Sequence, residues 1–213
     1  KARSVDDVQY NNTVQIAEQA FNSGNVDMSI SELEEMLKKN LSDVNREDAS
    51  IALASAYAQK GSLEFKETEY GNKAVSLLDV VIKNNPNISN AFRVRAYAYE
   101  IMQNYPAAID DYINAIRLDQ KNAMAYSGLG HAYSLMGDME KALPNLQEAV
   151  KLDPTLDHAL YNLARIYFNL RNTESAELYA KKVIDISKNN RFISEANGLL
   201  GLLKMSEYKY AEA

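Results

Sequence analysis

The chain has two histidines, His131 and His158, and no cysteine among its 213 residues. Imidazoles bind metal ions and transfer protons. The absence of cysteine excludes disulfides, thiolate nucleophiles and cysteine-ligated zinc. We expect His158 near the start of one helix and His131 about two turns into the preceding helix, an axial offset on the order of 10 Å. At that offset the two imidazoles cannot share a metal ion. We therefore expect no metal site and no catalytic histidine.

Acidic clusters are the other residues that suggest chemistry. They comprise Glu32, Glu34 and Glu35 in one segment and Glu64, Glu67 and Glu69 in another. Nothing in the sequence pairs one of these carboxylates as an acid with another as a base, and such clusters are typical of solvated helix faces. We expect no catalytic residues, no cofactor and no enzymatic activity.

Composition and charge exclude further classes of function. The chain is 46% hydrophobic with only 8 Gly and 4 Pro, which favours a folded helical protein. Its net charge of −6 argues against nucleic acid, whose sequence-independent binding requires clustered Lys and Arg. No apolar run reaches the roughly 20 residues that span a bilayer. We expect a soluble protein without membrane insertion, in the cytoplasm or as a bacterial periplasmic protein or lipoprotein ectodomain.

An alanine recurs every 34 residues, and this period organises the whole chain. The alanines are Ala74, Ala108, Ala142 and Ala176, and a tyrosine keeps the same step at Tyr99, Tyr133 and Tyr167. A period of 34 residues is too long for one helix or strand and indicates an array of identical supersecondary units. Function is therefore expected on a repeated surface.

The clearest unit, residues 123–156, predicts two antiparallel helices. Apolar residues at spacings of three and four form one helix face, which ends at Gly137. Asp138 can cap the second helix. The small residues Gly130 and Ala142 allow the two helices to approach closely. Because one pair buries too little apolar surface, neighbouring pairs must stack.

These residues resemble the tetratricopeptide repeat, a 34-residue helix-turn-helix family. The match consists of Leu129–Gly130, Tyr133, Gly137–Asp138, Ala142, Leu146, Ala149 and Asp153–Pro154. The resemblance implies an all-α fold, a right-handed superhelical α-solenoid of antiparallel helix pairs.

We expect one array over residues 1–213. Its predicted repeats are 10–43 (repeat 1, divergent and capping), 47–88 (repeat 2), 89–122, 123–156, 157–190 and 194–213, the last being the first half of a truncated repeat 6. Repeat 2 carries an insertion at about 62–70, placed by the repeat pattern in the turn between its helices. The truncated sixth repeat predicts that the chain is a piece of a longer protein, with an open C-terminal end.

The resemblance also implies where a partner binds, because in this family the first helices of the repeats line a concave groove. The side chains expected there are Asn90, Arg93, Tyr97, Glu100, Met124, Ser127, His131, His158, Tyr161, Arg165, Phe168 and Asn169. Aromatic, Arg and Met side chains are enriched in protein interfaces. We therefore expect a protein or peptide partner.

Two positions depart from what this family leads us to expect. Arg95 occupies the register of two buried leucines, so its guanidinium needs a partner, either Asp111 or Asp110. A second departure concerns the subfamily that grips the C-terminal carboxylate of heat-shock chaperones with Lys, Asn and Arg. The corresponding places here hold Arg93, Tyr97, Gly128, His158 and Asn162. This carboxylate clamp is therefore predicted to be absent.

Three hypotheses remain from the sequence. The leading one is a noncatalytic scaffold that binds a peptide segment or helix of a partner protein in the concave groove. The alternatives are a module that self-assembles through its open C-terminal end or through the 62–70 insertion, and a recruitment domain of a larger enzyme or complex.

Overall fold

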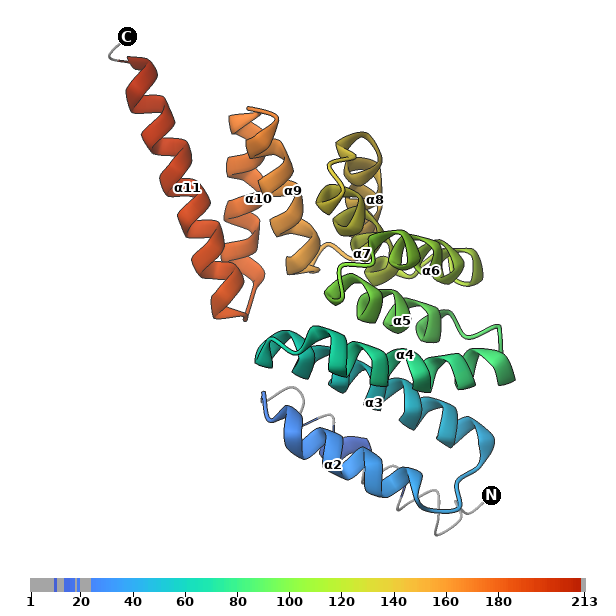
Figure 1. The fold of residues 1–213 in the computed structure, drawn as a ribbon. Coiled ribbons are helices and arrows are strands. Elements are labelled where there is room, and N and C mark those ends of the chain that lie inside the picture. The colour runs from blue at the N-terminus through green and yellow to red at the C-terminus, as the bar shows by residue number, and fades with distance from the viewer. Residues whose placement is uncertain (1–9, 11–13, 18, 20–23, 212–213) are drawn as a thin grey trace, which may run out of the picture. The chain divides into compact units, whose positions relative to one another are not determined.

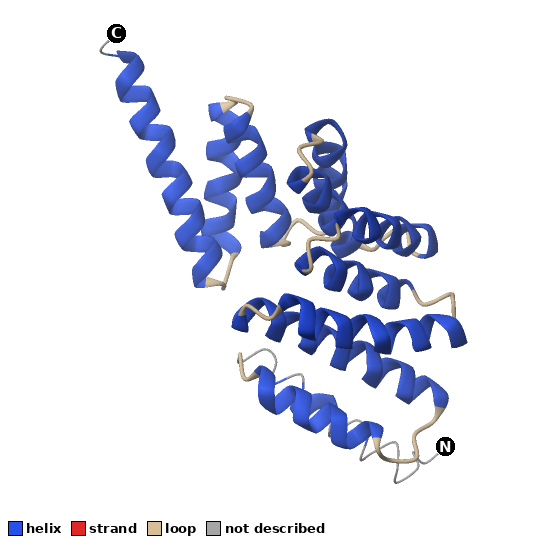
Figure 2. Ribbon diagram, viewed as in Figure 1, coloured by secondary structure: helices blue, strands red, loops and turns tan. Residues whose placement is uncertain are grey.

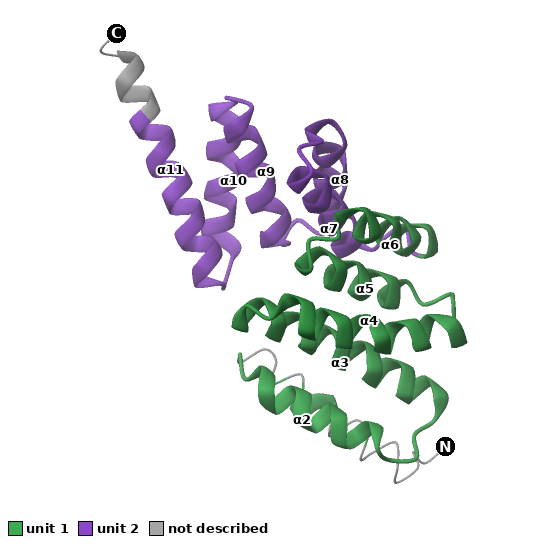
Figure 3. Cartoon of the chain, viewed as in Figure 1, with its two compact units in different colours: residues 1–118 green, residues 119–213 purple. Residues whose placement is uncertain are grey.

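A computed structural model describes residue 10, residues 14–17, residue 19 and residues 24–211, with side chains described as far as residue 205. Every regular element in these ranges is an α-helix (Figures 1 and 2). The chain divides into two compact units, residues 1–118 and residues 119–213 (Figure 3). Each unit is described by itself.

Unit 1 contains five labelled helices. They are α2 (Val26–Leu37), α3 (Asp43–Glu64), α4 (Glu67–Asn84), α5 (Ser89–Ile101) and α6 (Tyr105–Leu118). Each helix packs against the next one along the chain, and α3 also packs against α5. The core of this unit gathers small and branched side chains from α3, α4 and α5, among them Ala54, Leu78 and Val94.

Unit 2 repeats the same arrangement. Its helices are α7 (Ala123–Leu135), α8 (Met139–Leu152), α9 (Asp157–Asn169), α10 (Thr173–Ile186) and α11 (Asn190–Ala211). Consecutive helices pack together, and the first helices of successive pairs, α7, α9 and α11, also contact one another in order. The pairs α7–α8 and α9–α10 lie within the predicted repeats 123–156 and 157–190. Part of the predicted repeat 1 lies outside the described residues.

The α7–α8 pair shows why the sequence makes a tight hairpin. Asp138 accepts a hydrogen bond from the backbone N–H of Lys141 at 3.1 Å, which is the predicted helix cap. A Cβ placed on Gly130 would lie 2.6 Å from Leu146 Cγ and 2.9 Å from the carbonyl oxygen of Ala142. The helices therefore approach closely at Gly130, as the sequence predicted, and a residue larger than glycine does not fit there without a shift of its neighbours.

The turns within the hairpins share one backbone feature. Each contains a residue with positive φ, which is Phe65, Gln103, Gly137 or Arg171 in the turns after α3, α5, α7 and α9, and Gly24 precedes α2. A left-handed residue just after a helix ends it by satisfying its last carbonyls. Glycine adopts this conformation freely, whereas residues with a Cβ are disfavoured there by roughly 1–2 kcal/mol.

The predicted insertion at about 62–70 is not a longer loop. Only Phe65 and Lys66 lie between α3 and α4, and the added residues are helical. Accordingly α3 has 22 residues and α4 has 18, whereas each helix from α5 to α10 has 13 or 14. Helical growth keeps the backbone of the added residues hydrogen bonded, which a loop of the same length does not.

Candidate functional site

The predicted groove residues fall on both units. Asn90, Arg93, Tyr97 and Glu100 lie on α5 in unit 1, and the remaining eight lie on α7 and α9 in unit 2. Within unit 2, α7 and α9 contact each other and α11 extends the row. The α7–α9–α11 face, defined by His131, His158, Tyr161, Arg165 and Phe192, is therefore the surface we describe first.

The two histidines lie side by side, contrary to the sequence prediction. The ring centroids of His131 and His158 are 5.0 Å apart and their planes are inclined by 77°, an edge-to-face contact. The predicted offset assumed that α7 and α9 lie level. Instead, His131 contacts a residue 27 positions later and Ser127 contacts one 31 positions later, rather than 34. In the described residues no third His, Cys, Asp or Glu joins them in a group that could hold a metal ion.

His158 is held by two buried polar side chains. Its Nδ1 is 3.0 Å from Ser127 Oγ on α7, and its Nε2 is 3.2 Å from Asn162 Nδ2 on α9. The same Asn162 nitrogen also lies 3.5 Å from Nδ1, so its amide is placed beside both ring nitrogens. Ser127 and Asn162 are only 3% and 1% exposed. Ser127, which the sequence analysis placed in the groove, is buried against the His158 ring.

Phe192 completes this aromatic surface and was missed by the sequence analysis. Its ring centroid lies 5.9 Å from that of His158 and 5.9 Å from that of Tyr161. Phe192 follows His158 by one repeat step of 34 residues, so the period itself was the signal that could have found it. The α11 helix thus continues the face formed by α7 and α9.

The rest of this face mixes charge with apolar area. Partial burial, and then the nearby Glu195 of α11, raise the pKa of the half-buried Tyr161 hydroxyl. Arg165 is half-buried, and Phe168 also packs against the core between α9 and α11. Met124 and Asn169 are exposed at the two ends of the face. The face therefore combines aromatic and apolar area with charged and polar side chains.

The four predicted groove residues of unit 1 all lie on α5 and make contacts within that unit. Arg93 donates to Asn90 Oδ1 through Nε at 2.9 Å and Nη2 at 2.7 Å. Tyr97 packs against the unit 1 core. Glu100 is only 9% exposed and accepts a 3.2 Å hydrogen bond from the Tyr112 hydroxyl. Its burial removes Glu100 from the accessible part of the surface.

Arg95 has the predicted partner and a second one. Its Nε and Nη2 donate to the two carboxylate oxygens of Asp111 at 2.7 and 2.8 Å, a bidentate pair. Its Nη1 donates to Asp79 of α4 at 2.7 Å, which the sequence analysis did not anticipate. The hydrogen bond to Asp111 is the main cause that raises the pKa of Arg95. Arg95 therefore joins α4, α5 and α6.

Family models match the part of the chain that contains these helix pairs. A TPR repeat model matches residues 96–137, and tetratricopeptide repeat models match residues 123–156 and 157–190. The chain is a tetratricopeptide repeat (TPR) protein. The predicted family is thereby confirmed, and with it the all-α solenoid fold class.

Curated relatives of this TPR protein are longer chains. It is 30% identical to small glutamine-rich tetratricopeptide repeat-containing protein 2 of Mycosarcoma maydis over 129 residues, 61% of this chain and 36% of that one. It is also 30% identical to Hsp70-Hsp90 organizing protein 3 of Arabidopsis thaliana over 144 residues, 68% of this chain and 25% of that one. The chain thus spans about a third or less of these relatives.

Solved structures share the fold of this TPR protein at low identity. A thermophilic TPR protein of Thermus thermophilus superimposes with a TM-score of 0.77 at 20% identity, covering 90% of this chain and 98% of that one. MamA from Desulfovibrio magneticus gives a TM-score of 0.59 at 22% identity, covering 87% and 97%. Among the described residues, none of the helices is both long and apolar enough to span a membrane.

Proposed function

We propose that this TPR protein is a noncatalytic scaffold that binds a peptide segment or a helix of a partner protein on the α7–α9–α11 face. The observation that carries the proposal is the aromatic row His131, His158, Phe192 and Tyr161, whose rings are in mutual contact while remaining half-exposed. Rigid aromatic side chains bury much area on binding at a modest entropic cost.

The way His158 is held supports a preformed binding surface. Ser127 and Asn162 fix both of its ring nitrogens, so the imidazole does not have to be ordered when a partner arrives. Rotamer freedom lost before binding no longer opposes binding. An apolar or aromatic anchor of the partner fits against Phe192 and Tyr161, and Arg165 supplies a positive charge at the edge of that contact.

The relatives named for Hsp70 and Hsp90 raise the question of a chaperone-tail partner. Recognition of a free C-terminal carboxylate requires several accessible cationic or amide side chains. At the matching positions of unit 2, Gly128 has no side chain to offer, and the amide of Asn162 is buried against His158. We therefore propose recognition of an internal segment through its side chains.

The proposal is tested with peptides selected from a random phage-displayed library on the immobilised full chain. Tyr161→Ala is expected to weaken binding of the selected peptides by about 30-fold or more, as for an interface hot spot. Leu178→Ala, an exposed residue on the second-helix side of the same unit, is the matched control and is expected to leave affinity unchanged.

The binding experiment needs one control, and two outcomes would contradict the proposed peptide site. Helical content by circular dichroism must be the same in both variants, so that a loss of binding in Tyr161→Ala is a loss of contact. Peptides that bind Tyr161→Ala as tightly as the unchanged chain, or a library that yields no binder at all, contradict the proposal.

A further inference from the structure

The α3–α4 hairpin ends in an exposed apolar tip formed by Leu63 and Phe65. Phe65 is 86% exposed and Leu63 is 62% exposed. Phe65 also has φ of 56°, in the left-handed region that disfavours residues with a Cβ, whereas the α7–α8 turn uses Gly137 there. Neither backbone preference nor packing within the chain explains a phenylalanine at this position.

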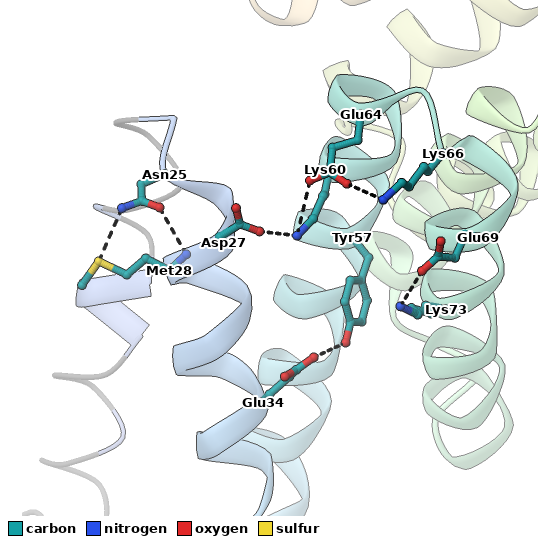
Figure 4. A network of polar contacts seen from close by, with 10 residues as sticks. All are labelled: Asn25, Asp27, Met28, Glu34, Tyr57, Lys60, Glu64, Lys66, Glu69 and Lys73. Carbon is teal, nitrogen blue, oxygen red and sulfur yellow. Dashed lines mark hydrogen bonds and ion pairs between the residues drawn. The ribbon is translucent and has the colours of Figure 1, made fainter.

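Charged side chains next to Leu63 and Phe65 in the sequence connect the end of α3 to its neighbours (Figure 4). Lys60 of α3 pairs with Asp27 of α2 and, at 3.5 Å, with Glu64, and Glu64 lies 3.3 Å from Lys66. The ammonium group of Lys60 also lies 5.3 Å from the ring centroid of Tyr70 on α4. Each exposed pair is weak alone, but together they link α2, α3 and α4 under the tip. These contacts thus connect the end of α3, next to the tip, to α2 and α4.

A pocket of about 390 Å³ opens on the same unit, between α3 and α4. It is lined by Leu53, Tyr57, Asn72, Lys73, Ser76 and Leu77. Apolar side chains thus form much of its wall, with one cationic side chain among them. It is shallow and widely open to solvent, so a side chain of another molecule can reach it from outside.

We propose that two copies of this chain exchange their hairpin tips, with Phe65 of each copy entering the pocket of the other. The tip precedes Glu67, where α4 begins, and the α4 residues of the pocket are 72–77. A two-fold axis that crosses α4 between these places puts each tip over the other copy's pocket. Such an interface is isologous and closes as a dimer.

The charges between the tip and the pocket are complementary under this two-fold axis. Glu69 and Lys73 lie 3.1 Å apart on the exposed side of α4. Copies that run antiparallel along α4 bring Glu69 of one against Lys73 of the other. Opposite charges therefore meet across the axis, which favours this register over one that pairs like charges. A second copy of the chain is the occupant that these observations favour.

The carboxylates around the tip oppose a lipid surface as the alternative occupant. Glu64, Glu67 and Glu69 all lie within four residues of Phe65 in the sequence, with Lys66 as the cation next to it. Anionic bilayers attract basic segments, so this charge pattern is unsuited to them. The proposal goes beyond peptide binding in unit 2 and does not rest on it.

Sedimentation equilibrium of the full chain tests the dimer. The unchanged chain is expected to approach twice its 23.9 kDa monomer mass as concentration rises. Phe65→Ala is expected to weaken dimerisation by about 30-fold or more with unchanged helical content. Leu170→Ala, an exposed leucine in the α9–α10 turn of unit 2, is the matched control and is expected to dimerise normally.

A mixing experiment tests the exchange itself. Ser76→Trp fills the pocket from an exposed position on α4 and is expected to abolish dimerisation without touching the tip. An equal mixture of Phe65→Ala and Ser76→Trp restores one intact tip and one intact pocket, so we expect heterodimers. A monomeric unchanged chain at all concentrations, a dimer that survives Phe65→Ala, or a mixture without heterodimers overturns the proposal. None of these results alters the peptide test with Tyr161→Ala.

Discussion

The α5–α6 pair of unit 1 and the α7–α8 pair of unit 2 fill the same repeat positions with different chemistry. Arg95 precedes Leu129 by one 34-residue step. The leucine is buried, whereas the guanidinium is bonded to Asp111 and Asp79. The repeat determines which positions are buried. Each helix pair then fills a buried position either with an apolar side chain or with a polar side chain that has hydrogen-bonding partners.

A second position shows the same contrast. Tyr112 in α6 corresponds to Leu146 in α8, one step later. The Tyr112 hydroxyl finds an acceptor in the buried Glu100, whereas Leu146 packs against Gly130. The α5–α6 pair therefore depends on specific partners, and the α7–α8 and α9–α10 pairs depend on shape. Predicted effects of substitution differ accordingly.

The largest effect is expected from Leu163→Ala in unit 2. Leu163 is fully buried between α8 and α9, so its truncation loses apolar burial and leaves a cavity. We expect a loss of about 3 kcal/mol in the free energy of unfolding. Urea denaturation followed by circular dichroism measures it, and a loss below about 1 kcal/mol would show that the core of unit 2 collapses to fill the space.

The corresponding test in unit 1 is Asp111→Ala, with an expected loss of about 2 kcal/mol. Removal of Asp111 leaves Arg95 with the exposed Asp79 alone. Breaking a fully buried pair costs about 3–5 kcal/mol, and the partial exposure of Arg95 reduces that figure. The double variant Arg95→Leu with Asp111→Ala replaces the ion pair with apolar side chains, the leucine being the residue that unit 2 has at the position of Arg95. It is expected to lie within about 1 kcal/mol of the unchanged chain, and a larger loss would mean that the ion pair is required.

Sequence reasoning could reach the fold because the repeated residues report directly on helix packing. The 34-residue alanine series and Gly130 mark the crossings where two backbones approach, and these positions are determined within one helix pair. The ion pair of Arg95 with Asp111 followed from the same register. Its second partner Asp79 lies on the preceding helix pair, where contacts depend on how the pairs stack.

The parts that sequence reasoning missed depend on contacts between particular side chains of neighbouring helices or on helix length. The contact of His131 with His158 joins residues 27 positions apart on α7 and α9, a separation that the 34-residue period does not predict. Residues 62–70 were predicted to lie in a turn because the repeat pattern shows how many residues are added to repeat 2. It does not show whether the added residues extend the helices or the loop between them. The burial of Glu100 and Ser127 likewise depends on their partners Tyr112 and His158.

A pH titration sharpens the comparison between Tyr112 and Leu146. Complete burial, and then the charge of Glu100, raise the pKa of Tyr112 well above 10.0. Above about pH 10 the unfolded chain loses this proton while the folded chain keeps it, so stability falls as pH rises, by up to about 1.4 kcal/mol per pH unit. Tyr112→Phe is expected to reduce the slope of unfolding free energy against pH by that amount above about pH 10. An unchanged slope would show that Tyr112 ionises in the folded chain as it does in the unfolded one.

The smallest effects compare one glycine in each unit. A Cβ on Gly71 in unit 1 meets the flexible side chain of Met102 at 2.5 Å, whereas a Cβ on Gly130 in unit 2 meets a backbone oxygen at 2.9 Å. Alanine gains about 1 kcal/mol of helix propensity at either site. Met102 can move aside, so Gly71→Ala is expected to be close to neutral, but the carbonyl of Ala142 cannot move without separating α7 from α8. Gly130→Ala should therefore lose about 1 kcal/mol or more in urea denaturation, because overpacking outweighs propensity there. Equal effects at the two sites would mean that the closeness of the α7–α8 crossing does not limit the stability of unit 2.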